Sequence, residues 1–194
     1  AADAQVWVHA YASFGEPKYP AGFDHFGYAN PDAPKGGTLF LRNPDRRTNF
    51  DKFNYFTLQG NAPAGVLLLM LEPLAVLSGD EPQTMYGLLA EAISVAPDKR
   101  SISFRLHPKA RFSNGDPVTA EDVKHSFEMA RSKFASPAYR SLFDGVSKAT
   151  IVDERTVRFD LSDPSSDTLY ALGTNLYVFS RKWGVGADGK TMKP

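Results

Sequence analysis

Residues 85–127 read MYGLLAEAISVAPDKRSISFRLHPKARFSNGDPVTAEDVKHSF, a segment that predicts a β-hairpin followed by a helix. A Pro and Asp cluster at 96–99 separates two runs suited to strands and is typical of a chain reversal. In the second run, Ile102, Phe104 and Leu106 alternate with polar residues. This period of two indicates a strand with one buried face, so we expect the hairpin to pack against a core.

A helix is predicted to begin at Ala120, because the turn-forming residues 113–117 come shortly before it. Thr119 stands three residues before Asp122, which is the spacing of a capping box with Asp in place of Glu. Apolar residues then recur at helical spacing and predict a single stripe that packs on the hairpin. The residues of this stripe are Val123, Phe127, Ala130 and Phe134.

The same segment resembles a known family in the order, the spacing and the types of its residues. The hairpin, the FSNGDP turn and the TAEDVKHSF helix start are similar to the signature of the family 5 extracellular solute-binding proteins, the peptide- and oligopeptide-binding components of ABC importers. Other phrases resemble the YejA-like branch of this family, so that the resemblance covers nearly the whole chain. These phrases are KYP at 18–20, FDHF at 23–26, APKGGTL at 33–39 and EPQTMYGLLAE at 81–91.

The resemblance implies an α+β (mixed α/β) fold, the N-terminal portion of a two-lobed periplasmic binding protein of type II. Members of the family close their two lobes around a ligand at a hinge. Residues 55–161 would form the inserted hairpin-and-helix domain of the peptide-binding subgroup. Residues 1–54 and 162–194 would then be parts of the first lobe, and the second lobe would be absent from this chain.

The resemblance also implies a function, that of the solute-binding component of an ABC importer. Such a protein captures peptides or oligopeptides in the periplasm and delivers them to an inner-membrane permease. No signal peptide is visible, and Ala1-Ala2-Asp3 fits either the remnant of a processed export signal or an arbitrary boundary. Two alternatives stay open: a binding protein for a non-peptide solute such as an opine, a sugar or a metal complex, and a fragment of a peptide-acting hydrolase.

Four residues are candidate ligand contacts through the resemblance. Gln59, Gly60 and Asn61 match a loop that contributes to peptide binding in relatives. Tyr139 follows the capped helix, in a region that can also reach the ligand. The plain alternatives are an exposed turn for the loop and ordinary packing for the tyrosine.

Several classes of site are not expected from this sequence. There is no cysteine, and the four histidines never stand at the i, i+4 spacing of two ligands on one helix, so no metal site is predicted. No G-x-S-x-G motif or acid/base pair is recognisable, so we expect neither a catalytic residue nor an enzyme. Gly184, Gly186 and Gly189 spell G-x-G-x-x-G without the helix that a dinucleotide site needs, so no cofactor is predicted.

Charge and hydropathy argue against two kinds of partner. The formal net charge is 0 and no dense Lys/Arg run occurs, so no nucleic-acid partner is expected. The longest apolar run, 66–71, is far shorter than the roughly 20 residues of a membrane helix. The chain is therefore not expected to span a membrane.

The remaining elements are predicted from shorter patterns. Residues 63–71 are apolar all round and predict a buried helix that Pro73 ends. Residues 4–37 predict an extended segment that lies on a surface, and the aromatic residues at 50–57 predict core packing. The other expected elements are a strand at 38–42, a hairpin at 149–161, a helix at 164–173 and a last strand at 175–180.

Overall fold

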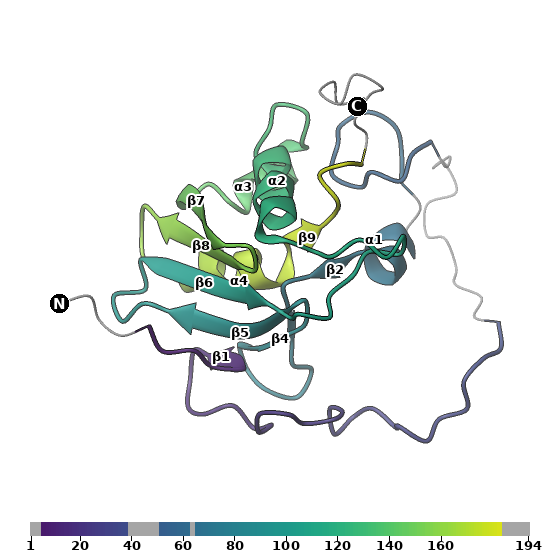
Figure 1. Ribbon diagram of the computed structural model, residues 1–194, viewed down its shortest axis with the longest axis vertical. Coiled ribbons are helices and arrows are strands. Elements are labelled where there is room, and N and C mark those ends of the chain that lie inside the picture. Colours follow the sequence, from purple (N-terminus) through teal and green to yellow (C-terminus); the bar gives the residue numbers. More distant parts are fainter. Residues whose placement is uncertain (1–4, 39–50, 63–64, 184–194) are drawn as a thin grey trace.

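The computed structural model describes residues 5–38, 51–62 and 65–183 (Figure 1). In these ranges the chain combines helices with strands that pair only in antiparallel fashion. The predictions that fall outside them are nearly all of the strand at 38–42, the helix start at Pro63 and the glycine motif at 184–189.

A four-stranded sheet forms the centre of the fold, and both predicted hairpins are part of it. Its strand order is β5-β6-β8-β7. Phe104 in β6 lies opposite Ile93 in β5 and Val157 in β8, so the two hairpins join through β6 and β8. The strands are β5 (Ala90–Val95), β6 (Ser101–Leu106), β7 (Val146–Asp153) and β8 (Thr156–Leu161).

The exposure of β6 confirms one half of its prediction and corrects the other. The three apolar residues of the strand are fully buried, as the alternation predicts. Ser103 on the opposite face is buried too, although a solvent-facing side chain is expected there. It lies between Ser94 and Arg158 of the neighbouring strands, and a serine in the middle of a sheet is short enough to be covered by its neighbours. Alternating polarity along this strand therefore does not mean alternating exposure.

Helix α2 (Ala120–Ala130) begins at the predicted residue and packs against the sheet (Figure 1). Val123 and Phe127 are buried, and the ring centroids of Phe127 and Phe159 lie 5.2 Å apart. Both helix residues belong to the same buried cluster as the apolar residues of β6. The predicted joint core of hairpin and helix is confirmed.

The predicted apolar stripe is wrong at Phe134. The helix ends at Ala130 with Arg131 as its C-cap, so Phe134 lies beyond the helix and its side chain is 50% exposed. The carbonyl oxygen of Phe134 accepts the backbone N–H of Leu58 at 3.1 Å. After the helix the chain turns and bonds to the segment that contains Leu58. The helical spacing of apolar residues therefore no longer applies at Phe134.

Thr119 and Asp122 have the arrangement of the predicted capping box, although Thr119 Oγ1 accepts no well-formed hydrogen bond from the N–H groups of the first turn. The better-formed hydrogen bonds are those to Asp122 Oδ2, which accepts the backbone N–H of Thr119 at 3.0 Å and its hydroxyl at 2.7 Å. The Asp122 side chain therefore accepts the hydrogen bonds that a Glu side chain usually accepts in a capping box.

Replacing Thr119 with alanine is expected to lower the free energy of unfolding by about 1 kcal/mol, the usual cost of losing an N-cap side chain. The change removes the hydroxyl that donates to Asp122 but keeps the backbone N–H that donates to the same oxygen. Urea unfolding followed by circular dichroism measures the loss. Thr119→Ser keeps a hydroxyl and should retain most of the stability, whereas an alanine variant as stable as the wild type would contradict the cap.

The N-terminal segment lies along the outside of the fold, as its composition predicts (Figure 1). Within residues 5–38, the one strand is β1 (Ala10–Ala12). It pairs with β4 (Thr84–Gly87), which also pairs with β3 (Ala75–Leu77) in a second sheet that the sequence did not predict. The hydroxyl of Tyr86 in β4 accepts the backbone N–H of Tyr19 at 3.1 Å and so helps to fasten the segment.

Helix α1 (Gly65–Met70) differs most from its prediction. Its apolar residues predict burial on all sides, yet Leu69 and Met70 are 74% and 63% exposed, whereas Val66 is buried. The prediction of a helix buried all round is therefore wrong. One side of this short helix packs inward and the rest faces outward. The chain continues into β2 (Glu72–Pro73), which pairs with β9 (Tyr177–Val178) at the predicted place of the last strand.

Helix α4 (Ser166–Thr174) confirms the predicted helix after the second hairpin, and Ser165 caps it by accepting the N–H of Thr168 at 3.4 Å. A Cβ added at Gly173 would lie 2.5 Å from Met85 Sδ, so glycine allows α4 to approach β4 this closely.

The main buried cluster contains residues on both sides of position 161. The division of the chain into a first lobe and an inserted domain stays a prediction. A further short helix is α3 (Pro137–Ser141).

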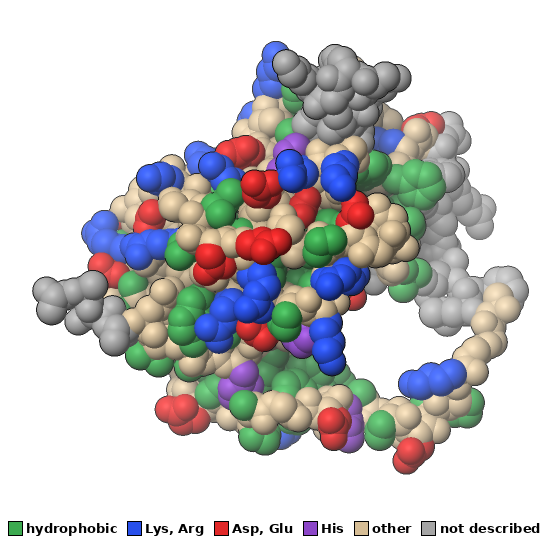
Figure 2. Space-filling model, viewed as in Figure 1, with side chains coloured by type: hydrophobic (Ala, Val, Ile, Leu, Met, Phe, Trp, Pro, Cys, Tyr) green, Lys and Arg blue, Asp and Glu red, His purple; other side chains and the backbone are tan. Residues whose placement is uncertain are grey.

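Charged side chains of both signs are interspersed over the face of the molecule shown in Figure 2. Glu91, for example, accepts hydrogen bonds from Arg105 at 3.1 Å and Arg155 at 3.4 Å.

Among the described residues, no helix combines the length and the apolar character needed to cross a bilayer. The same part of the chain holds no group of three or more His, Asp or Glu side chains placed to bind a metal ion.

Candidate functional site

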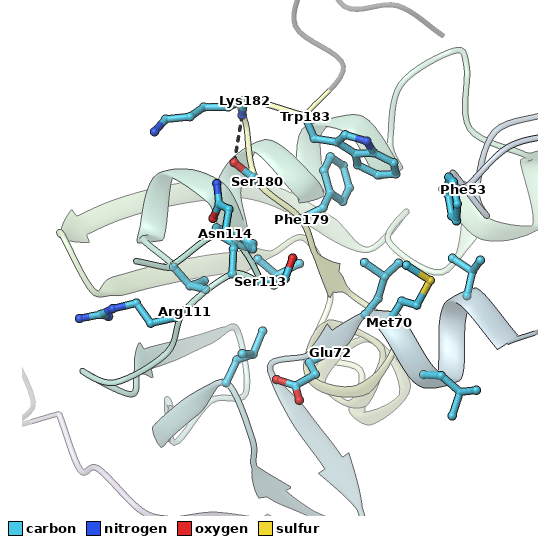
Figure 3. Close-up of a pocket in the computed structure, with 17 residues that line it drawn as sticks. Phe53, Met70, Glu72, Arg111, Ser113, Asn114, Phe179, Ser180, Lys182 and Trp183 are labelled. Atoms are coloured by element: carbon cyan, nitrogen blue, oxygen red, sulfur yellow. Dashed lines mark hydrogen bonds between the residues drawn. The ribbon is translucent and has the colours of Figure 1, made fainter. Parts of the chain in front are cut away.

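A groove of about 770 Å³ opens between α1, β2, the segment after β9 and the turn at 111–118 (Figure 3). This volume lies within the roughly 300–1,000 Å³ of pockets that bind small molecules. The residues around it come from elements far apart in the sequence, so the fold as a whole builds the groove.

One end of the groove is apolar. Met70 projects from the exposed side of α1, and Phe179 and Trp183 come from the segment after β9 (Figure 3). The rings of Phe179 and Trp183 pack edge to face with their centroids 5.4 Å apart. Phe53 also lines this end. Part of the helix that was predicted to be buried therefore faces a cavity.

The opposite end carries two cations that each donate hydrogen bonds to nearby protein groups. The guanidinium of Arg111 donates to the carbonyl oxygens of Pro108 at 3.1 Å and Ala110 at 2.8 Å. Lys182 Nζ donates to Asp116 Oδ2 at 2.9 Å, and this bond holds the pKa of the Asp116 carboxyl below its ordinary value. Figure 3 shows both cationic groups directed away from the middle of the groove.

The middle of the groove is polar. Glu72 of β2 and Ser113 of the turn lie there, and both side chains are exposed (Figure 3). Asn114 shapes the turn, because its Oδ1 accepts the backbone N–H of Asp116 at 3.0 Å. The groove thus has an apolar end, a polar middle and a rim of cations engaged by the protein itself.

Helix α2 holds the aromatic wall of the groove in place. Ser126 Oγ accepts the backbone N–H of Phe179 at 3.1 Å and donates to the carbonyl oxygen of Asp122 at 2.7 Å. Asp122 Oδ1 accepts the backbone N–H of Arg181 at 2.9 Å. Both side chains are buried. The capped helix that the sequence predicts therefore positions the segment from Phe179 to Trp183.

The predicted loop of Gln59, Gly60 and Asn61 is exposed and does not line the groove. Gly60 has φ +71°, a left-handed conformation that favours glycine. Asp51 Oδ2 accepts the backbone N–H of Asn61 at 3.0 Å and closes the loop. The structure brings the three residues together on the surface, and their role as ligand contacts stays a prediction.

Tyr139 lies outside the groove, against a smaller buried cluster formed by Phe56, Ala135 and Phe179. Its hydroxyl donates to the carbonyl oxygen of Asn175 at 2.7 Å and lies 2.5 Å from the hydroxyl of Tyr55. Phe56 is buried, which confirms core packing for part of the aromatic segment. A role for Tyr139 as a ligand contact stays a prediction.

Raising the pH from about 9 to about 11 is expected to destabilise the wild type more than a Tyr139→Phe variant. Burial raises the pKa of Tyr139 from 10.0 to about 12. Below pH 10 the tyrosine is protonated in both the folded and the unfolded chain, so its contribution to stability is fully present. Above pH 10 the unfolded chain loses the proton first, which favours unfolding until the folded tyrosine ionises as well. Urea unfolding at both pH values measures the difference, and equal losses in the two proteins would contradict it.

Sequence reasoning misses the residues of the groove for identifiable reasons. An all-apolar helix gives the same pattern whether it is buried or faces a ligand, so Met70 carries no signal of its own. Glu72 and Ser113 stand next to proline-containing or turn sequences that are common on protein surfaces. The place of Glu72 in the groove depends on the pairing of β2 with β9, two short strands that are distant in sequence.

Comparison with known proteins identifies relatives over most of the chain. Residues 84–193 match the family described as bacterial extracellular solute-binding proteins, family 5 Middle. The chain is 36% identical over 192 residues to the probable peptide-binding protein YejA of Agrobacterium fabrum strain C58, with 98% of this chain and 30% of that protein covered. It is 37% identical over 166 residues to the peptidoglycan-binding protein YepA of the same strain, with 82% and 26% covered.

A solved structure supports the same assignment. The fold is similar to that of the binding protein AgaA from A. tumefaciens R10 in complex with agropinic acid, with a TM-score of 0.55 and 26% identity over 66% of this chain and 25% of that one. The mixed helices and sheets thus form part of the two-lobed periplasmic binding fold, and the YejA-like resemblance is confirmed. The chain spans less than a third of the length of the relatives described here. It belongs to the family 5 bacterial extracellular solute-binding proteins.

Proposed function

We propose that the protein is the solute-binding component of an ABC importer, which captures peptides or oligopeptides in the periplasm and delivers them to an inner-membrane permease. The observation that carries this proposal is the groove of about 770 Å³ in a chain of the family 5 solute-binding proteins. An apolar end can bury part of a small solute, while a few polar side chains fix its orientation.

Peptides are the proposed solute because of the relatives. One is named a probable peptide-binding protein and another a peptidoglycan-binding protein. The similar structure AgaA is in complex with agropinic acid, so a non-peptide acid is the second candidate. The loop of Gln59, Gly60 and Asn61, together with Tyr139, is proposed to add contacts outside the groove.

The proposed role is binding without conversion of the solute. The ionisable side chains that line the groove in the described part of the chain are Glu72, Arg111 and Lys182. The two cations are engaged by other groups, and one carboxylate alone does not make an acid/base pair. This supports a binding protein over a hydrolase.

Calorimetry with a pool of tripeptides tests the proposal on the full-length protein and on this 194-residue chain. The full-length protein is expected to bind far more tightly, because a ligand held between two lobes draws affinity from both walls. Comparable affinities would contradict the two-lobed mode of binding. Mass spectrometry of the incubated peptides separates retention from turnover, and turnover would favour the hydrolase.

A further inference from the structure

A buried nitrogen of His125 lies where α2 contacts the segment from Phe179 to Trp183, a contact that we call the joint. The imidazole ring packs against the ring of Phe179, with the two centroids 5.6 Å apart. Among the described residues, His125 Nε2 is the one buried side-chain nitrogen or oxygen without a hydrogen-bond partner. Buried polar atoms in folded proteins are nearly always hydrogen-bonded, so this exception needs a physical reason.

Two hydrogen bonds from neighbouring positions of α2 hold the joint together. Asp122 Oδ1 accepts the backbone N–H of Arg181 at 2.9 Å, and Ser126 Oγ accepts that of Phe179 at 3.1 Å. Ser126 follows His125 directly, and Asp122 stands three positions before it, about one turn along the helix. A change in the imidazole therefore acts on the backbone that carries the aromatic wall of the groove.

The neutral and the protonated ring differ in what Nε2 requires. In the neutral ring the proton can stay on Nδ1, and Nε2 is then an acceptor whose lone pair is not used. The protonated ring has an N–H donor on both nitrogens, so Nε2 would become a charged donor without an acceptor. Leaving a buried donor unpaired is costly, and the cost is larger when the donor is charged. The closed joint therefore tolerates the neutral ring and disfavours the protonated one.

The charged groups around the ring do not reverse this preference. Arg181, from the segment packed on the helix, disfavours a proton on His125, whereas Asp122 and Glu128 of the same helix favour one. The Asp122 carboxylate already accepts three hydrogen bonds. Glu128 is 60% exposed and pairs with Lys124 at 3.8 Å. Burial is the largest effect, and it lowers the pKa of His125 below its ordinary value of 6.5.

We propose that His125 is an acid-sensitive switch: when its ring takes up a proton, the segment from Phe179 to Trp183 detaches from α2 and the groove loses its aromatic wall. Well above pH 6.5 the ring is neutral whether the joint is closed or open. Below that pH the open joint takes up the proton first, so acid favours opening. In terms of the proposed function, the solute is held near neutral pH and released in acid. The switch itself does not depend on which solute the groove holds.

Hydrogen exchange of the full-length protein without any solute tests the switch. The protection of the Phe179 and Arg181 amides is measured at about pH 7.5 and about pH 5 and corrected for the intrinsic effect of pH on exchange. In the wild type we expect it to fall about 5- to 10-fold in acid, in line with one buried donor left unpaired. His125→Phe keeps an aromatic ring in the joint but cannot take up a proton, so its protection should be equal at both pH values. His125→Gln is neutral at every pH and repeats the test with a smaller side chain.

His25→Phe is the matched control, because the chemical change is the same but His25 is exposed in the N-terminal segment and does not line the groove. It should lose protection in acid as the wild type does. An equal fall in the wild type and in both His125 variants would mean that another group senses the acid. That result would overturn the proposal, and so would a wild type that keeps its full protection at about pH 5.

Calorimetry with the tripeptide pool at the same two pH values separates the switch from the proposed function. The wild type is expected to lose affinity in acid by a similar factor, and His125→Phe to keep its affinity. A wild type whose protection falls while its affinity stays constant would overturn the link between the joint and the groove. If protection falls in acid but no peptide binds at either pH, the switch stands and the proposed peptide solute is wrong.

Discussion

Replacing Phe104 with alanine is expected to lower the free energy of unfolding by about 3–5 kcal/mol, the usual cost of removing a large side chain from a packed core. Phe104 is 0% exposed, and its ring centroid lies 6.2 Å from that of Phe159 in the neighbouring strand. It stands in an inner strand of the central sheet, where hydrogen-bonded neighbours on both sides prevent the chain from collapsing into the space. Urea unfolding followed by tryptophan fluorescence and circular dichroism measures the loss.

Phe134→Ala is the matched control, because the chemical change is the same but the side chain is half exposed and lies beyond the end of α2. We expect it to cost less than about 1 kcal/mol. A cost below about 1 kcal/mol at Phe104, or equal costs at the two positions, would mean that the core does not run through β6.

Replacing Asp122 with alanine is expected to cost about 3 kcal/mol, since it leaves several donors without an acceptor. The carboxylate is only 4% exposed. It accepts the N–H and the hydroxyl of Thr119 through Oδ2 and the N–H of Arg181 through Oδ1. The same change should speed hydrogen exchange at the Arg181 amide, because that group loses its partner. Urea unfolding and amide exchange by mass spectrometry give the two measurements.

Glu121→Ala serves as the control for Asp122, one position earlier in the first turn of the same helix. Its carboxylate pairs with the Arg181 guanidinium at 2.8 Å, but both side chains are 54% exposed, so we expect a cost below about 1 kcal/mol. Hydrogen exchange at the Arg181 amide should be the same in Glu121→Ala as in the wild type. If the two alanine substitutions lower the free energy of unfolding equally, the charge near the helix start rather than the buried hydrogen bonds explains the effect, and our account of Asp122 is wrong.

The parts of the fold that follow local rules could be predicted from the sequence. The β5–β6 hairpin needs only alternating side chains and a turn at 96–99, and α2 needs only a capping box and an apolar stripe. Thr119, Asp122 and the buried residues Val123 and Phe127 are therefore found where the sequence places them. The prediction fails at Phe134, because the end of a helix depends on what the next residues can contact.

The parts that depend on distant pairing could not be predicted. The sheet of β1, β3 and β4 consists of strands of three or four residues, too short for a clear period of two. The groove requires β2 to meet β9, and neither strand exceeds two residues. The exposure of Met70 follows from this geometry, because nothing in the composition of α1 distinguishes its inner from its outer side.

The attachment of the N-terminal segment also sets an order of folding. Ser13 Oγ donates to the hydroxyl of Tyr170 at 3.1 Å across 157 positions of the chain, and β1 pairs with the distant β4. Closing such long loops costs more chain entropy than closing the hairpin of β5 and β6. We therefore expect the hairpins and α2 to assemble before β1 docks onto β4. During synthesis from the N-terminus, β1 is made well before its partner strand and stays unpaired until β4, at residues 84–87, has followed it.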